Sequence, residues 1–551
     1  MTNAKHLIIF SISPVQSFIS QARKTGDLFA GSRILSEVSK AAVKSIKENS
    51  NKVIFPQESE SLPNRIVAIV ENDPEKVCKD AEKQAEAEFK EQIKTDTNFL
   101  RINYVAVPLS DCKDAYKEAY TKAEKYLGAV KNAGEFEKFV EEGGKKCSLC
   151  GERNVVIYRK TENDEKNERD KGESWLYKKK LFLPKEEVSV FSSDDEQKIK
   201  LKDLRKGECL CAVCAGKRSY SQNESFPSTV YFSLLSKINP EEIKQKETEL
   251  EDIQKIYETK EGRSLPKYYA LLHFDGDSMG KWLSGENLVE GKDLQEFHTK
   301  LSLQLSAFAK CAEEVVGDAK NAKIGRTVYS GGDDFLGFVT LENLNDVLEE
   351  LEGKFEEKVN EPLKDFLKDG KKLTFSISVV IAHYKTPLNK VLNYARSTLD
   401  EVKNRFRKSG KDGVVLTYIT KSNSITTAFM KKDKMEPFFE VIKKLKDDKG
   451  PSSNFIYTFA EEFKKFDLEN KTFDEYLTLK KMMETELKRL LERSWTGDKN
   501  KTEREELLQK LLSILLEQTV EHSSNCYSVD LNNFTETLMI ADKLSAGGGN
   551  D

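Results

Sequence analysis

The sequence predicts an α+β fold with two ferredoxin-like halves, an insert between them and a helical C-terminal region. The main observation is that short apolar runs and longer helical stretches follow the order β-α-β-β-α-β before residue 110, and follow it again after residue 266. The second observation is a charged insert with a Cys-x-x-Cys pair near each end. The expected domains are 1–135, 136–262, 263–422 and 423–551.

The composition is that of a multidomain protein without a membrane span. A chain of 551 residues is too long for one core, since domains hold about 100–200 residues. Hydrophobic residues make up 38% and charged residues 33%, and no run of ~18 apolar residues occurs. The apolar core of "MTNAKHLIIFSISPVQ" is too short and too interrupted for a secretory signal. We therefore expect a cytoplasmic protein with no membrane partner.

The charge balance excludes a protein that coats nucleic acid by itself. Lys and Arg number 89 against 93 Asp and Glu, which gives a formal net charge of −4, whereas such proteins carry a large positive excess. Any contact with nucleic acid is therefore local or shared with partners. Residues 145–218 hold 19 Lys and Arg against 14 Asp and Glu, which is compatible with a solvated surface or with a patch that faces nucleic acid.

The first half opens on a strand-like run at 5–12, followed by helical periodicity from Pro14 to about Asn49. Ser13, directly before Pro14, is a plausible N-cap of that helix. The remaining elements expected in this half are strands at 52–56 and 65–71, a helix from Pro74 to about Lys94, a strand at 99–109 and a helical pattern at 111–142.

Two Cys-x-x-Cys pairs bound the insert: Cys147 with Cys150, and Cys211 with Cys214, separated by sixty residues. Four thiolates from two such pairs suit tetrahedral Zn²⁺, so we expect a zinc-binding helical insert domain with a closed structural site. Cys209 competes for a place, but it lies only two residues before Cys211 and fits the spacing less well. A redox role is the alternative, and no thioredoxin-like context supports it.

The second half repeats the first pattern from a strand at 266–277 and adds one helix–strand unit, so we expect a divergent internal duplication. Its further elements are a helix at about 291–316, a hairpin at 327–338, a helix at about 342–366, a strand at 372–384, a helix at 387–408 and a strand at 413–420. Residues 421–551 are almost wholly helical in pattern, with 503–522 as the clearest amphipathic stretch.

The hairpin "TVYSGGDDFLGF" carries Gly331, Gly332, Asp333 and Asp334 at its tip. Glycines supply the positive φ angles that two-residue hairpin turns demand. A turn needs only glycine, so the two adjacent carboxylates require another explanation.

The strand one helix upstream ends in "HFDGDSMG", which places Asp275 and Asp277 two residues apart on one face. In a ferredoxin-like sheet the first strand lies beside the hairpin, so Asp275, Asp333 and Asp334 are expected to converge. Three carboxylates this close repel unless a cation offsets them. Mg²⁺ bound by one or two carboxylates and by substrate phosphates is the usual arrangement in nucleotidyl-transferring palms. A merely solvated turn is the alternative.

The first half lacks this acidic group, because its first strand ends in "FSISPVQSF" where the second half has "HFDGDSMG". We infer that the first half holds no catalytic metal. It would instead complete a binding surface or an acceptor site, with the region from Ser13 to Phe18 as the candidate.

Together these segments resemble the large signature subunit of type III CRISPR effector complexes, most closely its Cmr (type III-B) branch. The resemblance covers essentially the whole chain. "SPVQSFISQARKTGDLFAGSRILS" (13–36) is similar to the N-terminal palm signature of that branch, and the cysteine pairs are similar to its zinc site. "FDGDSMGKW" and "YSGGDDF" are similar to its active palm, and "SISVVIAHYKTPL" (376–388) to its later palm strand.

In that family the subunit converts ATP into cyclic oligoadenylates when the guide-bearing complex captures target RNA. The resemblance implies that Asp275, Asp333 and Asp334 bind catalytic Mg²⁺ or Mn²⁺, while Zn²⁺ is structural and ATP is the substrate. It also implies other Cmr subunits, guide RNA and target RNA as partners. The candidate nucleotide-binding residues are Gly276, Asp277, Gly331, Gly332 and Lys403, of which Asp277 is a weaker metal candidate.

One departure from the family concerns the HD nuclease domain with which many members begin. This sequence starts at the palm pattern, and none of its five histidines is followed by aspartate, so we expect no HD-dependent DNA cleavage by this subunit. Two further residues stay open. Lys403 either meets phosphates or ends a solvated basic helix, and His383 is a structural histidine or a catalytic base.

Three functions compete at this stage. The first is a target-RNA-activated nucleotide cyclase. The second is a catalytically silent scaffold that organises guide RNA and small subunits, against which the intact carboxylates argue. The third, a diguanylate cyclase, is disfavoured because the turn continues Asp-Asp-Phe rather than ending in Glu-Phe, and because such enzymes have no place for a duplicated palm or a zinc insert.

Overall fold

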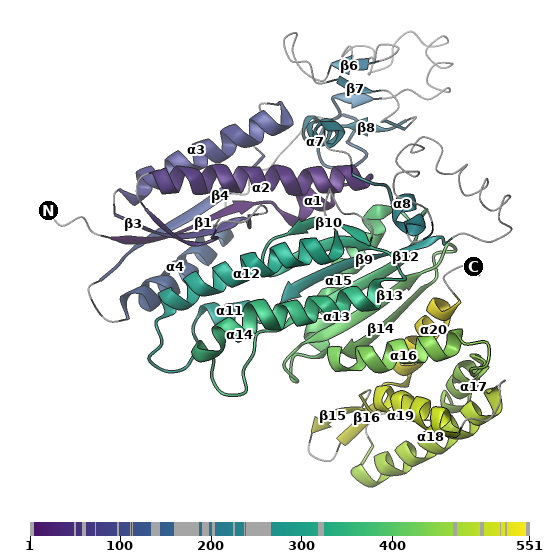
Figure 1. Cartoon of the computed structure of the whole chain (residues 1–551). Helices are drawn as coiled ribbons and strands as arrows, with labels where there is room; N and C mark the ends of the chain where they lie inside the picture. The colour runs from purple at the N-terminus through teal and green to yellow at the C-terminus, as the bar shows by residue number, and fades with distance from the viewer. Residues whose placement is uncertain are drawn as a thin grey trace, which may run out of the picture.

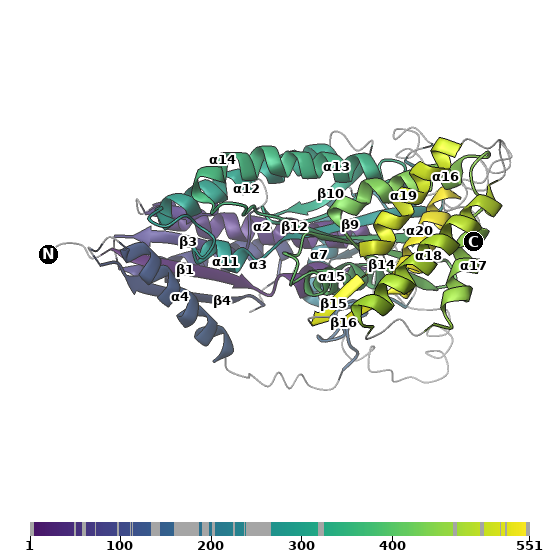
Figure 2. The same cartoon turned by 90° about the horizontal axis from the view of Figure 1, so that it is seen from below.

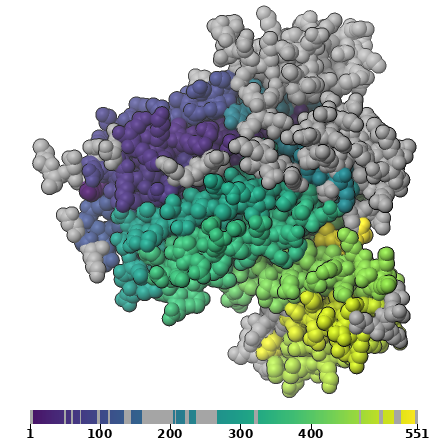
Figure 3. Space-filling model, in the orientation of Figure 1, coloured from purple at the N-terminus to yellow at the C-terminus, as the bar shows by residue number. Residues whose placement is uncertain are grey.

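The computed structural model describes residues 5–48, 51–57, 62–71, 73–95, 99–110, 112, 114–133, 144–158, 187–189, 198–200, 204–205, 207–223, 226–235, 237, 266–317, 324–466, 471–495, 501–517, 519–523 and 526–546. These residues form two large β-sheets with helices packed on their faces, three two-stranded sheets and a mainly helical region at the C-terminal end (Figure 1). On the face shown in Figure 3, the N-terminal half lies against the second half along its length.

The first sheet has four antiparallel strands with helices on both faces. Its elements are β1 His6–Ser13, α1 Gln16–Ser20, α2 Thr25–Glu48, β2 Lys52–Phe55, β3 Arg65–Val70, α3 Pro74–Ile93, β4 Arg101–Pro108 and α4 Ala115–Asn132. The strand order β2-β3-β1-β4 is that of a ferredoxin-like fold. Because side chains alternate along β1, Ile8 and Phe10 pack with α2 and α3, whereas Leu7 and Ile9 join the core that contains α4.

The second sheet repeats this order and extends it by two strands. Its elements are β9 Tyr268–Gly276, α11 Met279–Leu283, α12 Leu294–Val316, β10 Gly325–Ser330, β11 Asp334–Val339, α13 Leu344–Phe355, η2 Glu356–Asn360, α14 Glu361–Leu363, η3 Lys364–Phe366, β12 Phe375–His383, α15 Leu388–Arg405, β13 Gly413–Ile419 and β14 Ile425–Lys431. The strand order is β10-β11-β9-β12-β13-β14. The strands β12 and β13 run parallel and are joined by α15, which is the added helix–strand unit.

The two halves pack against each other through their helices and share hydrophobic cores. Helix α12 contacts β2 and α4 of the first half, and α2 contacts β10 of the second, an arrangement that Figure 2 shows from below. The hydroxyl of Ser302 accepts a hydrogen bond from the backbone N–H of Gln57 at 2.9 Å. One continuous core includes Leu7 and Ile9 of β1 together with Leu305 of α12. The hairpin tip and the region after β1 are therefore held in a fixed relation.

The helix expected from Pro14 to Asn49 is two helices, α1 and α2, with a break at residues 21–24. The cause lies far away in the chain. The ammonium group of Lys217 donates to the backbone carbonyls of Phe18 and Gln21, at 2.6 and 2.7 Å. The local periodicity of the sequence cannot predict a contact with a residue some two hundred positions away.

Ser13 is not the N-cap that its place before Pro14 suggests. Its hydroxyl donates to the backbone carbonyl of Arg101 at 2.8 Å, so it belongs to the end of the β1–β4 pair. The N-cap position of α1 falls on Val15, which makes no side-chain capping bond.

The C-terminal region is less uniformly helical than its sequence pattern suggests. Its elements are η4 Lys432–Lys434, α16 Met435–Lys446, α17 Asn454–Phe463, α18 Phe473–Ser494, α19 Lys501–Glu517, β15 Thr519–Ser523, β16 Cys526–Val529 and α20 Leu531–Ser545. Strand β14 continues the second sheet past residue 422, and β15 pairs with β16 where helix was expected. No helix in the described part of the chain is both long enough and apolar enough to cross a membrane.

Helix α20 returns to the outer edge of the second sheet. The side-chain carbonyl of Asn533 accepts from the backbone N–H of Phe429 on β14, and its NH₂ group donates to the Phe429 carbonyl, each at 2.8 Å. These are the two hydrogen bonds that a neighbouring strand would make. The sheet therefore ends at β14.

The described part of the insert is built around the cysteine pairs. Its elements are β5 Ile157–Tyr158, β6 Glu187–Ser189, β7 Lys198–Lys200, β8 Cys209–Leu210, α7 Ala212–Asn223 and α8 Thr229–Leu234. Helix α7 packs against α2 and α3 of the first half. Much of the basic stretch 145–218, considered above as a patch for nucleic acid, lies outside the described residues.

Candidate functional site

The register of the second sheet brings two of the predicted carboxylates face to face. Strand β11 runs antiparallel to β9, and Asp334 is the direct partner of Asp275. Directly opposed residues in such a pair have Cβ atoms about 4.5–5.5 Å apart on one face of the sheet. The convergence expected from the sequence therefore occurs at the end of β9.

The third carboxylate lies in the hairpin turn itself. The backbone N–H of Gly331 donates to the Asp334 carbonyl at 2.8 Å, so Gly332 and Asp333 are the two turn residues. Gly332 has φ +98°, the region that the first position of such a turn reserves for glycine. Of the two glycines, only this one has a positive φ. The Asp333 carbonyl accepts from the N–H of Gly276 at 2.9 Å, which ties the turn to the end of β9.

Gly276 is enclosed by the turn. A Cβ atom added there would lie 3.0 Å from Asp333 Cβ and 3.0 Å from the Met279 side chain, tighter than ordinary van der Waals contact. The sequence motif therefore needs glycine at this position for the turn to approach β9, in addition to any contact with a nucleotide.

The electrostatics of the cluster call for a cation. Burial, together with the charges of Asp275 and Asp334, raises the pKa of Asp333 to about 7. Burial also raises the pKa of Asp275 above its ordinary value, although Lys403 opposes this. Crowded carboxylates ionise together only when positive charge offsets them. Carboxylate oxygens are the donors that a hard divalent cation such as Mg²⁺ or Mn²⁺ prefers, although within the described residues only the four cysteines bring three or more ligand atoms within 4.8 Å of one another.

Lys403 supplies part of that positive charge. From α15 it donates to the Asp275 carboxylate, and to the Gly276 carbonyl at 3.1 Å. It is therefore a member of the acidic cluster and does not end a solvated helix.

Asp277 stands apart from the other three carboxylates, although the sequence places it in the same motif. It is buried and accepts hydrogen bonds from Thr374 Oγ1 at 2.9 Å, Ser376 Oγ at 2.9 Å and the backbone N–H of Asp412 at 3.0 Å. Its oxygens are thus engaged by Ser376 of β12 and by the loops that precede β12 and β13. The arrangement fits a structural role.

Three further side chains surround Asp334 that sequence reasoning did not single out. Tyr329 Oη donates to Asp334 Oδ1 at 3.1 Å, and His273 Nε2 lies 3.3 Å from the same oxygen. Gln16 Nε2 donates to Asp334 Oδ2 at 3.4 Å from the first half. The alternation of β9 gives a signal for His273, which lies two residues before Asp275 and shares its face.

Arg396 is a second basic residue of α15 near the cluster. Its guanidinium interacts electrostatically with Tyr329 and Asp334, which oppose the lowering of its pKa by burial. It lies seven residues before Lys403, so the two share one face of the helix. This spacing was available in the sequence.

The four cysteines of the two pairs lie together in the insert. The sulfur atoms of Cys147, Cys150, Cys211 and Cys214 all lie within 4.8 Å of one another, and only Cys150 is more than slightly exposed. Four converging thiols with no other evident function fit a bound metal ion such as Zn²⁺. Cys209 faces elsewhere, with its sulfur 3.1 Å from Ser148 Oγ.

His383 has the structural surroundings that the sequence left open. It is buried at the end of β12, where Nδ1 accepts from the backbone N–H of Lys385 at 3.1 Å. Its ring packs against Tyr268 and Tyr384. These contacts account for the residue without catalysis.

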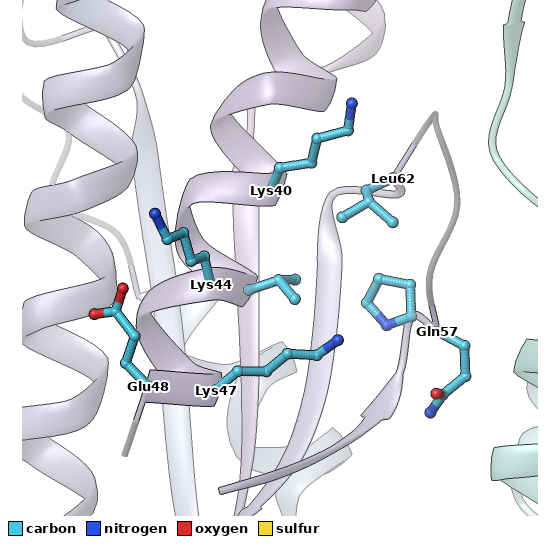
Figure 4. A pocket seen from close by; sticks show the side chains of 8 residues that line it. Lys40, Lys44, Lys47, Glu48, Gln57 and Leu62 are labelled. Atoms are coloured by element: carbon cyan, nitrogen blue, oxygen red, sulfur yellow. The ribbon is translucent and has the colours of Figure 1, made fainter. Parts of the chain in front are cut away.

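A separate hollow of about 410 Å³ lies between α2 and the end of β2, away from the carboxylates. Lys40, Lys44 and Lys47 line it, with apolar walls from Val43 and Leu62. The three ammonium groups point in different directions and do not converge on one point (Figure 4). It therefore lacks the geometry of a phosphate site.

The chain matches two family models. One, described as Cas10/Cmr2, second palm domain, matches residues 268–415, which include all three clustered carboxylates. The other, described as CRISPR-associated protein Cmr2, N-terminal, matches residues 7–61.

A relative and two solved structures agree with these matches. The CRISPR system Cmr subunit Cmr2 of Pyrococcus furiosus is 26% identical over 607 aligned positions, covering 83% of this chain and 66% of that protein. The chain thus spans just under two thirds of the length of that relative. Type III-B Cmr-beta structures, in the apo state and bound to cognate target RNA, match with TM-scores of 0.61 and 0.62 at 14% identity. These matches cover 99% of this chain and 82% and 83% of the chains compared.

At 14% identity the structural matches establish the fold alone. The similarity in sequence comes from the family models and from the relative in Pyrococcus furiosus. Both halves of the chain are represented in these matches. Residues 7–61 and 268–415 thus match Cmr2 and Cas10/Cmr2 family models, and together with the Pyrococcus furiosus relative they support a likeness to the large subunit of type III-B CRISPR effector complexes.

Proposed function

We propose that this chain is a metal-dependent nucleotidyltransferase that converts ATP into cyclic oligoadenylate, or a related adenylyl messenger, within an effector complex activated by target RNA. The observation that carries the proposal is the direct pairing of Asp275 with Asp334, with Asp333 in the turn beside them. One or two carboxylates and the substrate phosphates are enough to bind Mg²⁺, and this group supplies the carboxylates.

The reaction joins two nucleotides. A ribose hydroxyl of the acceptor attacks the α-phosphorus of the donor ATP, the new P–O bond forms, the bond to pyrophosphate breaks, and the hydroxyl proton passes to solvent water. Mg²⁺ or Mn²⁺, when bound, offsets charge on the phosphates and makes the hydroxyl a better nucleophile. Asp275, Asp333 and Asp334 would hold that metal, and such sites act chiefly by positioning and charge stabilisation.

The basic residues of α15 would receive the triphosphate. Lys403 already reaches Asp275 and the Gly276 carbonyl, so it lies where donor phosphates meet the metal site. Arg396 lies on the same helix near Asp334. Gly331 and Gly332 would let phosphate oxygens approach the turn, whereas Gly276 is enclosed between Asp333 and Met279.

The acceptor nucleotide would lie against the first half. Gln16 crosses from α1 to Asp334, so the region from Ser13 to Phe18 borders the same site as the carboxylates. The acceptor hydroxyl must come within about 3–3.5 Å of the α-phosphorus, in line with the departing pyrophosphate. A second surface, fixed relative to the metal site, meets this requirement.

The proposed partners are other Cmr subunits, guide RNA and target RNA. Support comes from the related type III-B structures, one of which is bound to cognate target RNA. The net charge of −4 is compatible with RNA contacts that are local or shared with partner subunits.

The deciding experiment is pyrophosphate release from ATP by the reconstituted complex with guide and target RNA, in Mg²⁺ or Mn²⁺. The double substitution Asp333→Ala and Asp334→Ala should abolish release and leave assembly intact. Normal turnover by the double variant would exclude the site. If the wild-type complex assembles on target RNA but releases no pyrophosphate, the chain is the alternative, a silent scaffold subunit.

The proposed zinc site is tested separately. Metal analysis of the purified protein should find about one zinc per chain, since four thiolates complete a tetrahedral shell. The double variant Cys147→Ser and Cys150→Ser should lose it, whereas Cys209→Ser, outside the cluster, should keep it. Full zinc content in the double variant would show that other residues bind the metal.

A further inference from the structure

Two adjacent cations are buried in the helix that follows the second cysteine pair. Lys217 and Arg218 of α7 each retain about 1% of their exposure. Lys and Arg are rarely buried to this degree unless they are paired, because desolvating a charge is costly. The groups that Lys217 and Arg218 bind therefore indicate which part of the structure these two residues stabilise.

Lys217 reaches across to α1. Its Nζ donates to the carbonyls of Phe18 and Gln21, at 2.6 and 2.7 Å, and lies 4.8 Å from the centre of the Phe18 ring. A helix of five residues satisfies few of its own carbonyls, and short helices are not stable alone. Lys217 thus supplies the donors that the C-terminal end of α1 lacks.

Arg218 fixes the turn between α1 and α2. It forms a two-pronged ion pair with Asp27, in which Nη2 donates to Oδ2 at 2.7 Å, and it also contacts Glu208 at 3.3 Å. Asp27 Oδ2 in turn accepts from the backbone N–H groups of Arg23 and Lys24. Although burial raises the pKa of Asp27, Arg218 outweighs it and holds that pKa below its ordinary value.

The backbone around α1 is packed too closely for adjustment. A Cβ atom added at Gly31 of α2 would lie 3.2 Å from Lys217 Cδ and 3.2 Å from Ile19 Cα. Lys217, α1 and α2 therefore meet without spare space. A change in the Lys217 side chain is expected to move α1 instead of being absorbed by its neighbours.

Gln16 is the first residue of α1 and the one that touches the acidic cluster, with Nε2 3.4 Å from Asp334 Oδ2. We propose that Lys217 and Arg218 are positioning residues that hold α1, and through it Gln16, against the carboxylate turn of the other half. The inference rests on the proposed function of that turn. It assigns to α7 a role in presenting the acceptor side of the site, although α7 contacts neither Asp333 nor Asp334 in the described residues.

The test replaces Lys217 by Met, which keeps the length of the side chain and removes the donors. Lys79→Met, on the exposed part of α3 where Lys79 pairs with Glu75, is the matched control. Hydrogen exchange of the purified chain should rise within residues 15–24 of the Lys217→Met variant only. This readout needs no turnover, so it remains valid if the proposed function fails.

Turnover by the complex then shows whether Lys217 acts through Gln16. Lys217→Met should lower turnover roughly ten- to hundredfold, since small misplacements near reacting groups have effects of that size. In a Gln16→Ala background the same substitution should cost less than about twofold more, because residues acting through one another are not additive. Metal-dependent ATP binding should persist in all these variants.

Two outcomes would overturn the proposal: unchanged exchange at 15–24, or an equal loss of turnover with and without Gln16. If Lys217→Met does not fold, Arg218→Lys takes its place, because it keeps the buried charge and removes the two-pronged pairing with Asp27. The same exchange and coupling results are then expected.

Discussion

Asp275 and Asp277 are two residues apart, yet they have opposite surroundings. Asp275 faces another carboxylate and a lysine, whereas Asp277 receives hydrogen bonds from Thr374, Ser376 and the Asp412 backbone. The motif "DGD" hides this difference because both residues are acidic and share a strand face in the sequence pattern. The difference arises from the segments that pack around the end of β9, which the local sequence does not reveal.

We predict that Asp277→Asn lowers stability and leaves metal-dependent ATP binding in place. The new NH₂ group would face hydroxyl and N–H donors, and an unsatisfied buried polar group costs about 1–3 kcal/mol. Asp275→Asn should do the reverse, with a small change in stability and loss of metal-dependent binding. Urea midpoints and ATP titrations with and without Mg²⁺ measure both effects. If the Asp277→Asn variant has a normal urea midpoint but no longer binds ATP with Mg²⁺, Asp277 is a metal ligand and this prediction is wrong.

The carboxylates of the site were predictable at this scale, and their partners were not. The residue types and spacing of Gly-Gly-Asp-Asp after a strand–helix unit predict a group of metal-binding carboxylates. Gln16 could not be assigned, because its contact with Asp334 depends on how two sheets from distant parts of the chain pack together. Lys403 and Arg396 are intermediate cases. Their spacing predicts that they share one face of a helix, but the sequence does not show that this face is turned toward the carboxylates.

Among the elements, the strands of both sheets other than β14 were predictable, and the breaks in the helices were not. Short, largely apolar runs locate β1, β9 and β12 to within a few residues. The break between α1 and α2 depends on Lys217 and Asp27. Similarly, β14 looked like the start of a helical region because its pairing with β13 is a tertiary feature.

The contact between α7 and α3 gives a prediction at the level of elements. A Cβ atom at Gly216 would lie 2.3 Å from the Ile93 carbonyl oxygen. Gly216→Ala should therefore destabilise the chain, because overpacking typically costs about 1–3 kcal/mol and exceeds the gain in helix propensity of about 1 kcal/mol. Gly128→Ala on α4, where nothing lies within 4 Å, should instead stabilise. Denaturation midpoints that shift in the same direction for both would contradict the close packing of α7.

In the whole molecule, the two halves meet at a buried histidine. His298 of α12 donates from Nε2 to the Leu283 carbonyl at 2.9 Å, so its Nδ1, 2.9 Å from Tyr116 Oη of the first half, is the acceptor. Burial lowers the pKa of His298 to about 4. The neutral ring is thus the form that this interface requires.

We predict that acid weakens the molecule through this residue. The unfolded chain binds the proton near pH 6.5 and the folded chain only near pH 4, so the stabilisation is complete above about pH 6.5 and is lost as the pH falls toward 4. The loss between pH 7 and pH 5 should be about 2 kcal/mol. His298→Gln, which can still donate to Leu283, should remove this part of the pH dependence. Equal slopes of urea midpoint against pH in both proteins would show that His298 does not contribute.

The hydrogen bonds between Asn533 and Phe429 have a consequence for synthesis of the chain. The two residues are 104 positions apart, so β14 leaves the ribosome long before the side chain that covers its edge. During that interval the strand exposes unpaired backbone groups, which readily pair with another chain. Nascent chains that stall after β14, or products shortened before α20, are therefore expected to aggregate more readily than the chain that includes α20.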